Sequence, residues 1–128
     1  MRLEARHGNV EGRGGIGLDV LVRQALRMRP DRLVVGECRG AEVRDLLAAL
    51  NTGHDGGAGT LHANGLAEVP ARLEAVGAVA GLAPAALARQ AVSAVDAVLH
   101  VERTPAGRRL ARVGRLRLDG DRLEAVPW

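Results

Sequence analysis

The stretch RPDRLVVGECRG, from Arg29 to Gly40, places a short apolar run directly before a single carboxylate. The run LVVG is bounded by charged residues, which is typical of a strand buried on both faces of a parallel sheet. Such a strand carries Glu37 to its carboxyl end, where open α/β sheets bind their ligands. An acid there can polarise a water molecule or hold a hydrated Mg²⁺, although a structural salt bridge to Arg39 explains the pattern equally well.

Amphipathic helices are predicted on both sides of this strand. Before it, apolar residues recur at helical spacing; they are Leu18, Leu21, Val22, Ala25 and Leu26. Pro30 ends this helix, because a proline disfavours the helical conformation of the residue before it. After the strand, apolar residues from Val43 to Leu50 predict a second helix, and Gly53 follows where a helix end favours a residue without Cβ.

The rest of the chain continues the alternation and then changes character. A strand is expected at about residues 59–63, followed by helical segments at about 69–80 and 84–95. Strands alternating with helices indicate an α/β fold with a mostly parallel sheet and flanking helices. The turn signals TPAG and DGD then separate three strand-like segments, so an antiparallel meander is expected over about residues 97–126.

Composition limits the classes of function. The 128 residues suffice for one modest core, which is either one domain or a piece of a larger one. All 18 basic residues are arginines, and Trp128 is the single aromatic residue, so stacking on nucleic-acid bases is not expected. With one cysteine, Cys38, and no signal-peptide pattern, we expect a cytoplasmic protein.

Positive charge is concentrated near the end of the chain. Six arginines and no acidic residue lie between Arg103 and Arg117. Such a segment can contact an anionic membrane surface or an acidic partner. A solvated sheet edge explains it at least as well.

The segment GRGGIG, Gly12 to Gly17, matches the glycine pattern G-x-G-x-x-G of dinucleotide-binding proteins. Its glycines are Gly12, Gly14 and Gly17, and Glu37 follows at the distance of the ribose-binding acid. The context is poor, because the preceding segment RLEAR is charged and does not run straight into the glycines. A dinucleotide-binding fragment is therefore the weaker alternative.

The segment TGHDGGAGTLHAN, Thr52 to Asn64, contains two histidines. Along a strand, Thr60, His62 and Asn64 would share one face, and a polar stripe needs polar partners in a sheet covered on both sides. His54 suits a helix C-terminus, where a cation is favourable, and His62 can also be a satisfied core histidine. No spacing of cysteines and histidines typical of a zinc site is present.

Taken together, the stretch LVRQALRMRPDRLVVGECRGAEVRDLLAALNTGHDGGAGTLHAN, residues 21–64, closely resembles the second half of the motor domain of type II/type IV secretion ATPases. The tight-adherence (Flp-type) pilus branch is the most similar. The resemblance extends from Arg2 to about Leu118. It implies a partial RecA-like P-loop ATPase core, with residues 1–128 as the C-terminal part of one such domain.

The resemblance also implies roles for individual residues. Val34, Val35, Gly36 and Glu37 would form the Walker B element, in which Glu37 acts on the attacking water near Mg²⁺, supported by Arg39. His54, Thr60 and His62 would belong to the histidine box that senses the nucleotide phosphates. The substrates implied are ATP and Mg²⁺, with Mg²⁺ held through water near Glu37 and no direct protein ligand.

The family further implies a hexamer at the cytoplasmic face of the inner membrane that works with membrane platform proteins in pilus assembly or secretion. No nucleic acid is expected as a partner. A Walker A loop needs a lysine, and the sequence contains none. We therefore expect a chain that does not hydrolyse ATP alone, arising from a truncated reading frame, a split or decayed gene, or an incomplete sequence. A non-catalytic interaction module of the same descent is the alternative.

Overall fold

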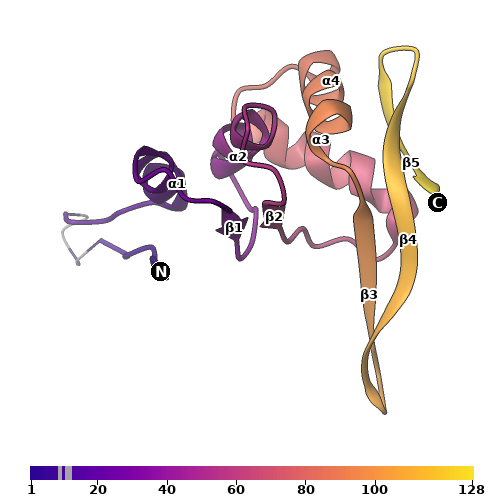
Figure 1. Cartoon of the computed structure of the whole chain (residues 1–128), viewed down its shortest axis with the longest axis horizontal. Helices are drawn as coiled ribbons and strands as arrows, with labels where there is room; N and C mark the ends of the chain where they lie inside the picture. The colour runs from indigo at the N-terminus through magenta and orange to yellow at the C-terminus, as the bar shows by residue number, and fades with distance from the viewer. Residues whose placement is uncertain (9, 11–12) are drawn as a thin grey trace.

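The computed structural model describes residues 1–8, 10 and 13–128. Along this part of the chain (Figure 1), the elements are α1 (Leu18–Arg27), β1 (Val34–Val35), α2 (Glu42–Leu50), β2 (Ala58–Gly59), the 3₁₀ turn η1 (Leu66–Glu68), α3 (Val69–Val79), α4 (Pro84–Ala94), β3 (Val98–Thr104), β4 (Gly107–Asp119) and β5 (Arg122–Pro127). The fold is mixed α/β, as the alternating pattern predicts. It contains a parallel pair, β1–β2, and an antiparallel sheet of order β3-β4-β5.

The helices begin and end where local chemistry requires. Helix α1 starts directly after Gly17, whose backbone is extended, and stops before Pro30. Between the end of α1 and Pro30, Arg29 takes a left-handed φ of 50°. This residue directly precedes the proline and is thereby kept out of the right-handed helical region. After α2, Gly53 takes a φ of 96°, which glycine adopts without a steric penalty. The predicted helix termination at both places is confirmed.

The parallel pair is shorter and more exposed than predicted. Val34 pairs with Ala58 and Val35 pairs with Gly59. Val35 is buried, but Val34 is 71% exposed, so the expectation of a strand buried on both faces is wrong for this chain. No described element covers the face that Val34 presents.

The second strand was expected at about residues 59–63, but β2 covers only Ala58–Gly59. One further backbone hydrogen bond, from Cys38 N–H to the Thr60 carbonyl at 2.8 Å, continues the pairing. Beyond it, residues 61–63 have no strand to pair with, because the chain after β1 turns away into α2. The alternation of faces nevertheless holds: Leu61 and Ala63 pack on the core, while Thr60 and His62 are exposed.

The predicted antiparallel meander is confirmed. The first half of β4 pairs with β3, from Thr104 opposite Gly107 to Val98 opposite Gly114, and its second half pairs with β5. Two glycines with positive φ, Gly107 (121°) and Gly120 (59°), make the connecting turns. The three strands form the sheet at the right of Figure 1.

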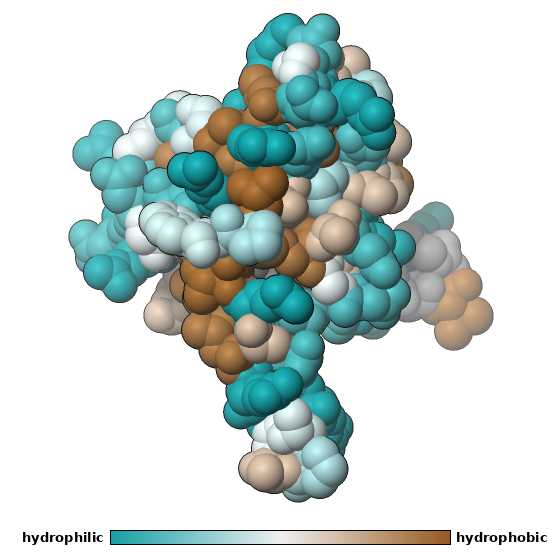
Figure 2. Space-filling view, turned by 90° about the vertical axis from the view of Figure 1, so that its right-hand side faces the viewer, coloured by the Kyte–Doolittle hydropathy of each residue, from teal (hydrophilic) through white to brown (hydrophobic). Residues whose placement is uncertain are grey.

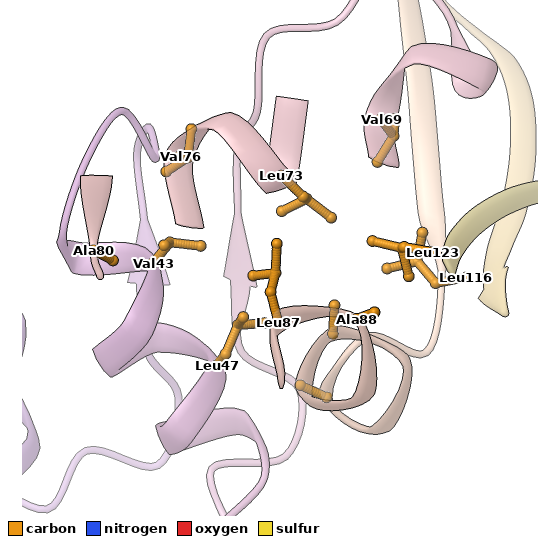
Figure 3. Packing of buried hydrophobic residues seen from close by; sticks show 12 residues of the cluster. Val43, Leu47, Val69, Leu73, Val76, Ala80, Leu87, Ala88, Leu116 and Leu123 are labelled. Carbon is orange, nitrogen blue, oxygen red and sulfur yellow. The ribbon is translucent and has the colours of Figure 1, made fainter. Parts of the chain in front are cut away.

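Buried apolar residues form two clusters. The larger cluster joins α2, η1, α3 and α4 to β4 and β5; its members are Val43, Leu47, Val69, Leu73, Val76, Ala80, Leu87, Ala88, Ala91, Ala94, Leu116 and Leu123. Leu87 of α4 lies at its centre, between residues of α2, α3 and the sheet (Figure 3). The smaller cluster lies between α1, β1 and α2; its members are Val22, Leu33, Val35, Cys38, Leu46 and Ala49. Leu50 of α2 packs against both clusters and so connects them.

The glycine segment before α1 does not take the form of a dinucleotide-binding loop. Gly12 lies outside the described residues. Among those described, no strand of either sheet precedes Gly14 and Gly17. Instead, Arg6 and Ile16 pair as an isolated antiparallel bridge with backbone hydrogen bonds of 3.0 and 2.8 Å. The parallel strand that the fingerprint requires in front of its glycines is therefore missing from this part of the structure.

Within the described residues, no single helix is both long and apolar enough to cross a membrane. The segments Leu66–Val79 and Pro84–Ala94 meet that criterion only as a pair, and they are bent by 117° at their junction.

Candidate functional site

The parallel pair brings two polar side chains to the same edge of the sheet. Glu37 follows β1 and His62 follows β2. Because the strands are parallel and in register, their carboxyl ends lie side by side, and the residues just beyond them meet. The hydrogen bond from Cys38 N–H to the Thr60 carbonyl keeps the two segments together past the last strand residues.

Glu37 is the centre of this arrangement. Its Oε1 lies 2.7 Å from His62 Nε2 and 2.5 Å from Arg39 Nε. The Glu37 side chain is only 24% exposed, whereas those of Arg39 and His62 are 77% and 70% exposed. The carboxylate is thus covered mainly by two groups that solvent or a ligand can reach.

The electrostatics of the site keep Glu37 ionised. The hydrogen bond from Arg39 is the main cause that lowers the pKa of Glu37, and the charge of Arg39 and the hydrogen bond from His62 act in the same direction. Partial desolvation opposes them. The Glu37 carboxylate in turn raises the pKa of Arg39. With its pKa lowered, the carboxylate is ionised at neutral pH and accepts hydrogen bonds, with Oε1 engaged twice.

Thr60 contributes its backbone N–H and carbonyl groups to the site. Its N–H donates to the Val35 carbonyl at 3.2 Å and its carbonyl accepts from Cys38. The His62 carbonyl accepts a 2.9 Å hydrogen bond from Arg72 Nε, which links the segment after β2 to α3. Asn64 donates to Glu68 from its side chain at 2.9 Å. Two side chains of the polar stripe therefore have partners, His62 with the distant Glu37 and Asn64 with the nearby Glu68.

His54 lies away from Glu37. Its N–H donates to the Ala49 carbonyl at the end of α2, and its carbonyl accepts from Gly57 before β2. Helix α2 begins near Glu37 and, at 1.5 Å per residue, its nine residues span about 13 Å. No described contact joins His54 to Glu37, Arg39 or His62. His54 Nδ1 is buried and has no hydrogen-bond partner among the described residues.

An open groove borders the site. It has a volume of about 1060 Å³ and runs along α1 and β1, from residues 1–4 to Glu37, Arg39 and Glu42. Its floor is apolar and includes Leu21, Val22 and Val34, while its polar end is the Glu37–Arg39 pair. The groove explains why Val34 is exposed.

The residues present fit an indirect role with Mg²⁺. No group of three or more His, Cys, Asp or Glu side chains within the described residues is arranged to hold a metal ion. One carboxylate suffices for an ion that keeps most of its water and binds mainly through substrate phosphates. Direct coordination by several protein groups is not what this cluster offers.

The arginine-rich strands form a separate surface on the three-stranded sheet. Arg109 pairs with Glu102 at 3.1 Å and Arg117 with Glu124 at 2.8 Å. The other four arginines between residues 103 and 117 have no ion-pair partner within the described part of the chain. Figure 2, which views the molecule from this side, shows apolar residues gathered between hydrophilic ones. Leu99 and Leu110 of these strands are exposed.

Sequence comparison identifies the family. The profile described as "Type II/IV secretion system protein" matches residues 3–110. The chain belongs to this family. It is 62% identical over 127 residues, 98% of its length, to a putative conjugal transfer protein of Mycobacterium tuberculosis, and 38% identical over 111 residues to the probable conjugal transfer protein TrbB of Sinorhizobium fredii. It spans 36% and 34% of these relatives, respectively, and so corresponds to about a third of their length.

A solved structure supports the same relationship. The VirB11 ATPase of the Brucella suis type IV secretion system, crystallised with sulphate, superposes with a TM-score of 0.67 at 27% sequence identity. The match covers 80% of this chain and 33% of VirB11. The predicted resemblance to type II/type IV secretion ATPases is thereby confirmed, and the mixed α/β fold is similar to that of VirB11.

Two residues near the site were not predicted. Arg72 holds the His62 carbonyl, and the buried Glu42 contacts the backbone that follows Glu37. Arg72 is ten residues from its partner in sequence, so no local pattern identifies it. One sequence feature could have identified Glu42. It is an acidic residue two positions after Gly40, at the start of a predicted helix.

Proposed function

We propose that this chain is the C-terminal part of the motor domain of a secretion or pilus-assembly ATPase, in which Glu37 acts on the water that attacks ATP. One observation carries the proposal: Glu37, Arg39 and His62 meet at the carboxyl ends of two parallel strands, where α/β sheets bind ligands. The relation to a VirB11 ATPase makes phosphoanhydride hydrolysis the reaction to test.

The chemistry follows from the charge on Glu37. Phosphoryl transfer needs positioning and charge stabilisation more than covalent chemistry. A carboxylate with a lowered pKa stays ionised and accepts a hydrogen bond from water, which orients the oxygen toward the terminal phosphoryl group. Arg39 and His62 supply positive or hydrogen-bonding groups beside the place where negative charge develops. Thr60 and His54 remain proposed members of the histidine box.

ATP and Mg²⁺ are the proposed ligands of the complete motor. Mg²⁺ neutralises charge on the phosphates when it is bound, and Glu37 would face it through water. The Walker B role proposed for Val34, Val35, Gly36 and Glu37 needs a phosphate-binding loop with a lysine, and the sequence has no lysine. We therefore propose that this chain by itself does not turn over ATP.

A RecA-like core accounts for the two separate sheets. Strand β2 pairs with β1 along one edge, and β3 pairs with β4 along one edge. The other edge of each strand has no strand partner within the described residues. We propose that a strand from outside the 128 residues pairs between them and joins both sheets into one. Such a strand would carry the phosphate-binding loop to the carboxyl end of β2, next to His62.

The assembly and the cellular place are also proposals. We infer a hexamer at the cytoplasmic face of the inner membrane that acts on membrane platform proteins. Within the family, the tight-adherence branch remains our sequence-based assignment. A non-catalytic interaction module is the second candidate, and the exposed apolar groove together with the arginine-rich strands favours it.

The test uses a chimera in which the preceding part of the Mycobacterium relative is fused to this chain. The chimera should hydrolyse ATP. Glu37→Gln should lower kcat by about 10²-fold or more, the usual range for a lost acid–base group, while a fluorescent ATP analogue still binds. His62→Ala should lower turnover without a matching loss of thermal stability.

Glu74→Gln is the control, because it removes a carboxylate from α3 that has no described contact with the site. It should leave kcat unchanged. Full turnover by the Glu37→Gln chimera would exclude the role proposed for Glu37. An unaltered chimera that binds a partner but never hydrolyses ATP would favour the interaction module.

A further inference from the structure

Glu42 is a buried acid beside the site. It is 6% exposed and is the one charged side chain in the core of the described residues. An isolated carboxylate in such a place is costly, so its burial requires compensating contacts. It is also the first residue of α2, where the helix dipole favours negative charge.

Glu42 contacts residues that precede it in the chain. Its Oε1 accepts hydrogen bonds from two successive backbone N–H groups, Arg39 at 2.5 Å and Gly40 at 2.9 Å. Hydrogen bonds to a charged acceptor are short and strong. A methyl group on Gly40 would lie 3.4 Å from Glu42 Oε2, so the backbone here passes close to the carboxylate.

These hydrogen bonds act on the segment that carries the site. Arg39 is two residues after Glu37 and holds the Glu37 carboxylate through its side chain. Fixing the Arg39 and Gly40 peptide groups sets the direction in which the chain leaves β1. It thereby fixes the backbone positions from which the Arg39 and Glu37 side chains extend. Ala41 makes no side-chain hydrogen bond at the start of α2, and Glu42 binds the N–H groups that precede the helix and not those of its first turn.

We propose that Glu42 is a positioning residue that holds the β1–α2 turn so that Arg39 and Glu37 face His62. Its catalytic consequence rests on the proposed function, but its structural consequence does not. The proposed role requires an acceptor oxygen as far from the backbone as a glutamate side chain places it. The charge itself is secondary.

The first experiment needs no nucleotide and uses Cys38, the single thiol of the chain. Burial is the main cause that raises the pKa of Cys38 to about 11, and the charges of Glu42 and Glu37 add to it. Alkylation by iodoacetamide at pH 8 should be slow in the unaltered chain, because only the thiolate reacts. Glu42→Asp, with a carboxylate one methylene shorter, should speed alkylation by roughly tenfold as the turn loosens.

Glu42→Gln keeps an acceptor oxygen at full reach but removes the charge that adds to the raised pKa of Cys38, so alkylation should rise slightly and stay slower than in Glu42→Asp. Asp45→Asn is the matched control on the same helix, since Asp45 pairs with Arg23 at 3.0 Å away from the turn. It should not change alkylation. Thermal melts of all variants separate local opening of the turn from global unfolding.

The second experiment measures kcat and KM for ATP in the chimera. Glu42→Asp should lower kcat by roughly tenfold with KM little changed, and Glu42→Gln should restore most of kcat. The reverse order, an active Glu42→Asp and an inactive Glu42→Gln, would overturn the proposal because charge would then matter more than reach. Unchanged alkylation and kcat in Glu42→Asp would overturn it as well.

The two experiments separate the two proposals. A chimera without any ATPase activity would reject the proposed function, and the alkylation series would still decide the role of Glu42. An active chimera in which only Glu37→Gln is impaired would support the proposed function and reject the positioning role.

Discussion

The two hydrophobic clusters differ in how completely they are closed. In the larger cluster, Leu87 and Ala91 are fully buried and Val43 is 1% exposed, because three helices and two strands surround them. The smaller cluster has α1 and α2 around β1, and its outer side opens into the groove that exposes Val34. The candidate site lies at the rim of the open cluster.

This difference separates stability from function. A closed cluster gives the chain its folding free energy, since burial of apolar area is the main favourable contribution. An open cluster beside a charged site leaves surface for another polypeptide segment or a ligand. Mutations in the two clusters should therefore differ in size and in what they affect.

The largest effect is expected in the closed cluster. Leu87→Ala should lower the free energy of unfolding by about 2–5 kcal/mol, because the surrounding helices cannot collapse onto the space left behind. Chemical denaturation followed by circular dichroism measures it. Leu99→Ala is the control, since Leu99 is 61% exposed and should change stability little.

If Leu87→Ala lowers the free energy of unfolding no more than Leu99→Ala does, the larger cluster is not the main source of stability.

A smaller effect is expected in the open cluster. Val35→Ala removes two carbon atoms from a residue that is 3% exposed and should cost about 1.5 kcal/mol. Neighbouring groups can relax toward the groove, which keeps the cost low. If the added part of the chimera covers the groove, the same substitution should cost more there. Equal losses in both proteins, measured by denaturation, would argue against such coverage.

The smallest effect is expected on the three-stranded sheet. Arg117→Gln breaks an exposed ion pair with Glu124 whose side chains are 57% and 38% exposed. Exposed pairs contribute little, so stability should change by no more than about 0.5 kcal/mol. A melt at low and high salt tests this. A loss above 1.4 kcal/mol, a tenfold change in the folding equilibrium, would mean that the pair is structural.

Much of the fold was predictable because local signals agree with it. Apolar spacing identified α1 and α2, with Pro30 and Gly53 marking where helix formation stops. The turn signals TPAG and DGD between three strand-like segments identified the meander. These features depend on neighbours within a few residues, so the sequence displays them directly.

The strands were less predictable. The run LVVG reads as a doubly covered strand, but whether a second layer covers Val34 depends on segments distant in sequence. Residues 61–63 have the alternation of a strand, and yet no strand among the described residues pairs with them. Similarly, the separation of His54 from Glu37 depends on α2, whose nine residues lie between them in the chain.

By itself, the sequence determined the order of helices and strands, the family resemblance, and Glu37 as the acid at a strand end. The Glu37–Arg39 pair was an expectation from sequence, whereas tertiary structure alone decided that His62 also meets that acid and that Glu42 accepts hydrogen bonds from the turn after β1. It also decided that no described contact joins His54 to that acid. The reason is physical: backbone propensities act over a few residues, whereas a hydrogen-bonded site depends on atoms placed within about 3 Å by strand register and helix packing.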